Sequence, residues 1–289
     1  MKKYSVSQEK ILRELADFQY LTVSQFVRLG ITKSKNGMYK ALRGVSDEHK
    51  PSTLKISCNP NPAIGRLETV YYLSNIGVKH LVTLGLEVGD IKYPKRDSVS
   101  FASDYYHRIY TVDFFISLKN WAIGKGKYLP DFFYYFQQSS GSQRNNKGGK
   151  SLSDTRLDIE MEGVGYIVPD GVFTLKRKDK TPIFGLFEQH NGKDTKKLLG
   201  QIRAHCVAMK LGAPSLKYNI QHDREYIANR VFVSFEHEAC MQATMHRLAK
   251  NSDFLPYMQA FVFKLSDDVI HTCFTDKWFH ANGKIADFF

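Results

Sequence analysis

Two acidic residues lie on short apolar runs that are close together in the chain. Asp170 lies within the run of residues 166–175, and Glu188 ends the run of residues 183–188. Both runs are rich in β-branched and aromatic residues, and the charged tract 176–180 between them is typical of a turn. This pattern predicts a β-hairpin, in which a residue late in the return strand lies beside one early in the outgoing strand. We therefore expect the carboxylates of Asp170 and Glu188 to converge.

Neighbouring carboxylates favour a bound cation, because two like charges repel one another unless a positive charge lies between them. Mg²⁺ and Mn²⁺ prefer carboxylate and carbonyl oxygens as ligands, and they serve phosphodiester chemistry by polarising a phosphate and activating a water molecule. The hairpin therefore predicts a Mg²⁺ or Mn²⁺ site at Asp170 and Glu188. The alternative is that both residues are strand-end charges that face water.

The composition favours a nucleic-acid-binding protein of two domains. The 289 residues are enough for two cores, and 41 Lys and Arg against 29 Asp and Glu give a formal net charge of +12. Such a charge favours a polyanionic partner, nucleic acid first and an anionic membrane second. The sequence has no apolar run of about 18 residues and no signal-peptide core, so we expect a soluble cytoplasmic protein. Four widely spaced cysteines indicate neither a zinc site nor a disulfide framework.

The first part of the chain has the element pattern of a winged helix-turn-helix domain. Three helices precede two short strands and a fourth helix, at residues 7–18, 22–30, 33–45, 54–58, 69–73 and 74–84. A capping box of Thr22 and Gln25 marks the start of the second helix. We assign residues 1–90 to this DNA-binding domain and residues 91–289 to a second domain.

The third of these helices carries two opposite stripes. The apolar stripe suits the core and consists of Met38, Ala41, Leu42 and Val45. The polar and basic stripe suits the major groove, where Asn and Arg hydrogen-bond base edges and Lys neutralises phosphate. We assign its members to DNA binding, namely Asn36, Tyr39, Lys40 and Arg43. The alternatives are a solvated helix face or a surface that binds protein.

The second domain is predicted to be mixed α/β (α+β), a layered sheet with helices on both sides. Around the central hairpin, helices are expected at residues 103–123, 194–210 and 238–250, and strands at 131–136, 155–160, 231–235, 260–265 and 271–274. The strand at 155–160 is expected to pair with the hairpin. Residues 139–150 predict a polar loop whose Arg144, Lys147 and Lys150 can contact a phosphate backbone.

The helix at residues 103–123 places an acid at the edge of its apolar face. That face consists of Ile109, Val112, Ile116 and Ile123. Asp113 borders it, whereas His107 points well away from it and faces either water or whatever binds outside.

Taken together, these features resemble the mobilisation relaxases of the MobC type, which are related to the replication-relaxation proteins of mobile elements. The resemblance covers most of the chain and rests on the N-terminal module, the helix with His107 and Asp113, and the motifs Val168-Pro169-Asp170-Gly171 and Phe187-Glu188-Gln189-His190-Asn191-Gly192. The family has a Pro-Asp and then a strand that ends in Glu-x-Asp-x-Gly. His190 here takes the place of the second acid, where the wider PD-(D/E)xK nucleases have a lysine.

The resemblance implies a winged helix joined to a degenerate restriction-endonuclease-like domain that nicks one DNA strand at a plasmid transfer origin. Asp170, Glu188 and the Gln189 carbonyl would hold the metal ion, with Asp113 as a further ligand. Plasmid DNA would be the main partner. An accessory mobilisation protein and a coupling protein are candidate partners.

The family lysine needs a replacement in this chain. Lys193, Lys196 and Lys197 follow the motif and can each supply an ammonium that stabilises charge at the phosphate. We assign Lys197 to the catalytic site and the other two to DNA contacts. His190, with an ordinary pKa of about 6.5, can take or deliver a proton.

Two other classes of protein compete with this interpretation. Rolling-circle and tyrosine relaxases normally show a His-hydrophobe-His triplet, and no two of the ten histidines lie two positions apart, so that class is disfavoured. A non-enzymatic replication initiator or transcriptional regulator stays open. Tyr106 is the best-placed tyrosine for covalent attack, since it precedes Asp113 by two helical turns. The hairpin is the stronger signal, and we expect hydrolytic or only transiently covalent nicking.

Overall fold

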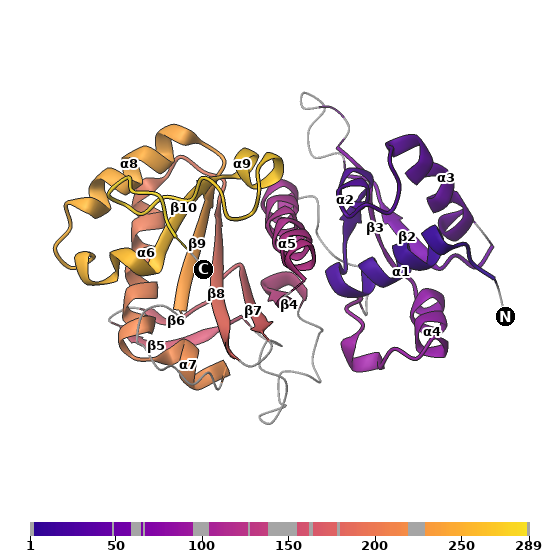
Figure 1. Ribbon diagram of the computed structural model, residues 1–289, viewed down its shortest axis with the longest axis horizontal. Helices are drawn as coiled ribbons and strands as arrows, with labels where there is room; N and C mark the ends of the chain where they lie inside the picture. Colours follow the sequence, from indigo (N-terminus) through magenta and orange to yellow (C-terminus); the bar gives the residue numbers. More distant parts are fainter. Residues whose placement is uncertain are drawn as a thin grey trace. The chain divides into compact units, whose positions relative to one another are not determined.

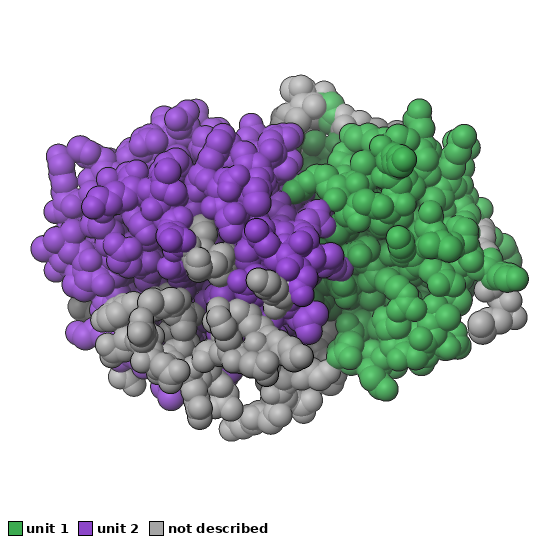
Figure 2. Space-filling model, viewed as in Figure 1, with its two compact units in different colours: residues 1–108, 139–142 green, residues 109–138, 143–289 purple. Residues whose placement is uncertain are grey.

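The computed structural model divides into two compact units, residues 1–108 with 139–142 and the remainder from residue 109 onward (Figure 2). It describes residues 3–47, 49–58, 65, 67–94, 104–126, 128–137, 155–161, 164–177, 180–218 and 229–287. The expected basic loop with Arg144, Lys147 and Lys150 lies outside the described residues.

Unit 1 consists of helices around a small antiparallel sheet (Figure 1). Its elements are α1 (Val6–Phe18), β1 (Leu21–Thr22), α2 (Val23–Arg28), α3 (Lys35–Ser46), β2 (Thr53–Ile56), β3 (Val70–Leu73), α4 (Asn75–Thr83) and the 3₁₀ helix η1 (Val88–Asp90). The strand order is β1-β3-β2. Leu12 and Leu15 of α1, Phe26 of α2 and Met38 and Leu42 of α3 are buried in its core.

Serine and threonine side chains start the helices of unit 1. The predicted capping box is confirmed: Thr22 Oγ1 accepts the Gln25 N–H, and Gln25 Oε1 accepts the Thr22 N–H. Ser34 and Ser74 cap α3 and α4 in the same way, each accepting the backbone N–H of a glycine at the third helical position. Each of these three helices therefore has a local N-terminal cap.

Unit 2 is mixed α/β, as predicted. Its elements are α5 (Tyr105–Lys125, of which residues 105–108 belong to unit 1), β4 (Tyr128–Tyr134), η3 (Tyr135–Gln137), β5 (Leu157–Met161), β6 (Val164–Ile167), β7 (Gly171–Arg177), β8 (Lys180–His190), α6 (Thr195–Lys210), α7 (Ala213–Tyr218), β9 (Asn229–Phe235), α8 (Glu238–Ala249), η4 (Leu255–Ala260), β10 (Phe261–Leu265) and α9 (Ser266–His271). The main sheet has the order β10-β9-β8-β7-β4. Strand β7 is antiparallel to β4 and β8, whereas β9 is parallel to β8 and β10.

Helices cover both faces of the main sheet (Figure 1). Successive side chains of a strand point to opposite faces, so neighbouring apolar residues of β8 contact different helices. On one face, Phe114 of α5 stacks on Phe187 of β8 with ring centroids 4.0 Å apart. On the other, Leu186 of β8 lies in one buried cluster with Ile202 of α6 and Met241 of α8. The predicted layers are thus confirmed.

Several predicted elements differ from the structure. The run 166–175 is not one strand: it is interrupted after Ile167, where Pro169 has no N–H to donate to a ladder. Strand β5 pairs with β6, which contains the first two residues of that run, in a separate two-stranded sheet and not with β7 or β8. The expected strand at residues 271–274 is wrong, since α9 runs to His271. Ile123 is 62% exposed and does not belong to the buried face of α5.

We expect Gly77→Ala to lower the free energy of unfolding of unit 1 by about 1 to 3 kcal/mol. A Cβ at this position would lie 2.3 Å from the backbone oxygen of Ser52, which cannot rotate away. Gly37→Ala is the matched control, because Gly37 has the same helical position and its added Cβ would meet nothing closer than 3.5 Å. Its stability should stay the same or rise by up to about 1 kcal/mol. Equal losses in urea unfolding would show that the Ser52 contact does not limit the packing of α4.

Candidate functional site

The register of β7 and β8 places Asp170 beside Glu188. Gly171 pairs with Phe187, so the residues before and after this pair face one another across the two strands. Asp170 Oδ2 accepts the backbone N–H of Gln189 at 2.7 Å, and the Asp170 carbonyl accepts the N–H of Tyr135 at 3.1 Å. The predicted hairpin is confirmed, and it brings the two acids to one end of the sheet.

Glu188 is buried, 6% exposed, and contacts a histidine of α6. His205 Nε2 lies 2.6 Å from Glu188 Oε1, and the imidazole is 1% exposed. We did not predict this residue. A signal was present in the sequence, since His205 continues the buried stripe of Leu198 and Ile202 at helical spacing.

His205 is neutral at physiological pH. Its burial lowers the pKa from 6.5 to about 4, although the charge of Asp170 acts in the opposite direction. The short contact with Glu188 is therefore a hydrogen bond to a neutral imidazole and not an ion pair. His205 Nδ1 has no hydrogen-bond partner among the described residues. Because a buried N–H without an acceptor is costly, we place the proton on Nε2, from which it is donated to the Glu188 carboxylate.

The side chains of Gln189 and His190 point to opposite faces of the sheet, as alternation along β8 requires. Gln189 Nε2 donates to Ser266 Oγ at 2.9 Å and to Asn191 Oδ1 at 2.7 Å. Its amide nitrogen is thus engaged on the face opposite to Glu188, while its Oε1 is buried without a hydrogen-bond partner among the described residues. The predicted ligand is the main-chain carbonyl of this residue. His190 is 8% exposed and its ring packs edge-on against Phe235.

The other predicted residues of the site have different surroundings. Lys193, Lys196 and Lys197 are exposed at the start of α6, where Asp194 accepts the N–H groups of the latter two. Asp113 is 5% exposed and lies on α5, which covers the face of the sheet opposite to Glu188. Within the described ranges, no group of three or more His, Cys, Asp and Glu side chains is arranged to hold a metal ion.

The polar stripe of α3 is exposed. Met38, Leu42 and Val45 of the same helix are buried, so the predicted division of the helix into two faces is confirmed. The residues predicted to bind DNA all lie on the exposed side: Asn36, Tyr39, Lys40 and Arg43. DNA binding by these residues stays a prediction.

Tyr106, the candidate for covalent attack, is 40% exposed at the start of α5 and packs edge-on against Tyr105. The chain has two other pairs of consecutive tyrosines, Tyr71 with Tyr72 and Tyr134 with Tyr135. Tyr71, Tyr72 and Tyr134 are buried, so Tyr106 is more accessible to solvent than these three.

Comparison of the chain with protein-family models, curated proteins and solved structures finds no match. Within the described part of the chain, no helix is both long and apolar enough to cross a membrane.

We expect the pair of His205 and Glu188 to make stability depend on pH. Because the folded pKa is about 4 and the unfolded value 6.5, only the unfolded chain binds a proton between these values, and stability falls as the pH drops from 6.5 towards 4. This loss is about 3 kcal/mol at most. His205→Gln, which keeps a donor near Glu188, should remove this part of the pH dependence in urea unfolding. His246→Gln changes an exposed histidine of α8 and should keep the wild-type dependence. An unchanged slope for His205→Gln would contradict the assignment.

Proposed function

We propose that this protein nicks one strand of duplex DNA in a reaction that depends on Mg²⁺ or Mn²⁺, as the resemblance to MobC-type relaxases of plasmid transfer origins implies. The observation that carries the proposal is the placement of Asp170 beside Glu188 at one end of the β7–β8 hairpin. Exposed lysines at the start of α6 follow directly in the chain. Acids that can hold a cation therefore lie close in sequence to cations that can hold phosphate.

Unit 1 suits the delivery of duplex DNA. Its element order and its three-stranded antiparallel sheet agree with a winged helix-turn-helix, in which α3 is the recognition helix. The exposed stripe of α3 carries the donors that read base edges and neutralise phosphates. The formal charge of +12 favours the same partner.

Unit 2 suits a restriction-endonuclease-like domain. Its elements follow one another as α5, β4, β7, β8, α6 and β9. The strands β4, β7 and β8 are antiparallel, β7 and β8 form the hairpin with the acids, and β9 is parallel to β8. The order agrees with the domain that the resemblance implies. We propose this fold for unit 2 on the topology and the two acids together.

The acids fit a hard divalent cation. Asp170 is only half-buried, so an ion can reach it from solvent, and the second carboxylate is held by His205. A hydrogen bond to a ligating carboxylate from a neighbouring side chain is the usual second layer of such sites, and it orients the ligand. When bound, the ion would polarise the scissile phosphate and acidify a water molecule. Asp170 and Glu188, with the Gln189 carbonyl, would hold it.

The remaining steps use side chains of this chain. Lys197 would stabilise negative charge that develops on the phosphate, and Lys193 and Lys196 would position the DNA backbone. His190 would take or deliver a proton, a role for which an imidazole is chemically suited. With water as the nucleophile, the products carry a 5′-phosphate and a 3′-hydroxyl, and Tyr106 takes no part.

One observation favours a second candidate, a DNA-binding replication initiator or regulator without enzymatic activity. Glu188 already accepts a hydrogen bond from His205, and the described residues contain no metal-binding group of three side chains. In that case the hairpin acids would serve structure alone. Incubation of supercoiled plasmids that carry transfer origins with the protein and Mg²⁺ or Mn²⁺ separates the two candidates, because only the nickase produces open circles.

We expect Asp170→Asn and Glu188→Gln each to abolish the formation of open circles while DNA affinity stays largely unchanged, because each removes a metal ligand and not a phosphate contact. Asp131→Asn changes an exposed carboxylate of β4 and should nick at the wild-type rate. Wild-type nicking by either hairpin variant would refute the site. Labelled strands that migrate with the denatured protein would refute the hydrolytic step.

For α3, we expect Lys40→Ala to weaken binding to all duplexes and to reduce the salt slope by about 1, since it removes a phosphate contact. Asn36→Ala and Arg43→Ala should instead relax sequence preference, with a cost of about 1 to 3 kcal/mol at the preferred site. Lys10→Ala changes an exposed lysine of α1 and serves as the control. Equal losses on preferred and random duplexes for all three α3 variants would show that this helix does not read bases.

A further inference from the structure

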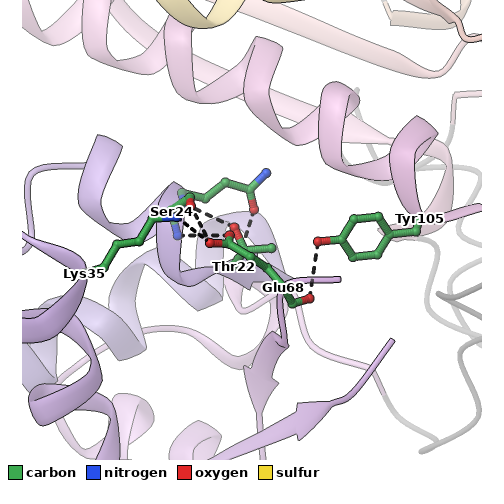
Figure 3. Close-up of polar contacts among 6 residues, drawn as sticks. Thr22, Ser24, Lys35, Glu68 and Tyr105 are labelled. Atoms are coloured by element: carbon green, nitrogen blue, oxygen red, sulfur yellow. Dashed lines mark hydrogen bonds and ion pairs between the residues drawn. The ribbon is translucent and has the colours of Figure 1, made fainter. Parts of the chain in front are cut away.

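Glu68, which lies just before β3, connects the starts of two helices of unit 1 (Figure 3). Its Oε1 accepts hydrogen bonds from Ser24 Oγ at 2.5 Å and from Lys35 Nζ at 2.8 Å, and its Oε2 accepts the Ser24 N–H at 3.3 Å. Ser24 is the second residue of α2, and Lys35 is the first residue of α3. One carboxylate therefore ties both helices of the proposed helix-turn-helix to the strand that follows Glu68.

The charges at these helix starts explain the need for an acid. The N-terminal end of a helix carries a partial positive charge, which favours acids and disfavours cations. Neither α2 nor α3, both fully described, has an acidic residue in its first turn, and α3 begins with a lysine. Glu68 supplies the missing negative charge to both. Burial acts to raise the pKa of its carboxyl, but hydrogen bonds from Lys35 and Ser24 outweigh this and lower the pKa.

The backbone of Glu68 is held as well. The hydroxyl of Tyr105, a side chain that is 7% exposed, donates to the Glu68 carbonyl at 3.2 Å (Figure 3). The Glu68 side chain is 30% exposed and that of Lys35 is 57% exposed. The Lys35 end of the ion pair is thus exposed to solvent, whereas Glu68 is held in place by hydrogen bonds to its backbone and its side chain.

We propose that Glu68 is a positioning residue that determines specificity: it fixes the start of α3 and withholds the Lys35 ammonium from DNA phosphates. This inference rests on the proposed DNA binding by α3. The N-terminal residues of a recognition helix lie nearest to the groove, where an unengaged lysine would add a phosphate contact without sequence information. Because Lys35 is paired with Glu68, the duplex contacts the exposed polar stripe of α3, whose side chains can read bases.

A double-variant cycle in the full-length protein tests the proposal. Binding is measured between 50 and 200 mM salt on a duplex selected from a random pool and on a scrambled duplex. Lys35→Gln alone should change neither affinity nor salt slope, because the ammonium is already neutralised. Glu68→Gln should steepen the salt slope by about 0.9, which is about a threefold larger loss of affinity over this range, and should lower the ratio of selected to scrambled binding. Glu68→Gln with Lys35→Gln should return the salt slope to the wild-type value.

Glu87→Gln is the matched control, since it removes the charge of an exposed acid in the same unit. Circular dichroism establishes that each variant is folded. The proposal on Glu68 is wrong if Glu68→Gln and Glu87→Gln have the same salt slope and the same ratio of selected to scrambled binding. It is also wrong if Lys35→Gln reduces the salt slope equally in the presence and absence of Glu68. In both cases DNA binding by α3 stands. A folded wild-type protein that binds neither duplex would overturn the DNA-binding function and the role of Glu68 together.

Discussion

Two contacts in which a phenyl ring lies directly on a glycine hold the central hairpin in place. A Cβ at Gly171 would lie 2.5 Å from Cζ of Phe115, and one at Gly185 would lie 2.3 Å from Cζ of Phe173. Glycine at position 171 allows α5 to approach the sheet closely, and glycine at position 185 leaves room for the Phe173 ring of the neighbouring strand β7. A slip of one residue would turn every side chain of a strand to the other face. The ring contacts thus specify the register in which the two hairpin acids face one another, and the rest of the site depends on it.

On the face of β8 that packs against α6, a carboxyl group lies within an apolar layer. Glu188 lies between the buried side chains of the cluster formed by β8, α6 and α8, and burial of a lone charge is costly. His205 reduces this cost by one hydrogen bond, and its own burial lowers the pKa of the imidazole to about 4. The hydrogen bond fixes the direction of the Glu188 carboxyl group, which lies across the hairpin from the half-buried Asp170.

Local patterns predicted much of this architecture. The capping box at Thr22, the two faces of α3 and the hairpin with its two acids follow from patterns within single short stretches of the chain, and all three are present in the structure. Features that depend on how elements pair or pack against one another were not predictable in this way. The contact of His205 with Glu188 joins residues from different elements, and the pairing of β5 with β6 depends on the interruption of a run that reads as one strand. Apolar periodicity places a residue on a face but does not identify its partner across the core.

The position of β8 in the sheet has a consequence for biogenesis. Its neighbour β7 precedes it directly in the chain, whereas its other neighbour, β9, begins only at Asn229, after two further helices. During synthesis from the N-terminus, the second edge of β8 therefore exists for a time as an open edge with Phe184 and Leu186, and parallel pairing across a long connection forms slowly. An inward-pointing charge on such an edge discourages pairing with other chains. Glu188 is a charge of this kind, since it lies on β8 and is made before both its histidine partner in α6 and the neighbouring strand β9.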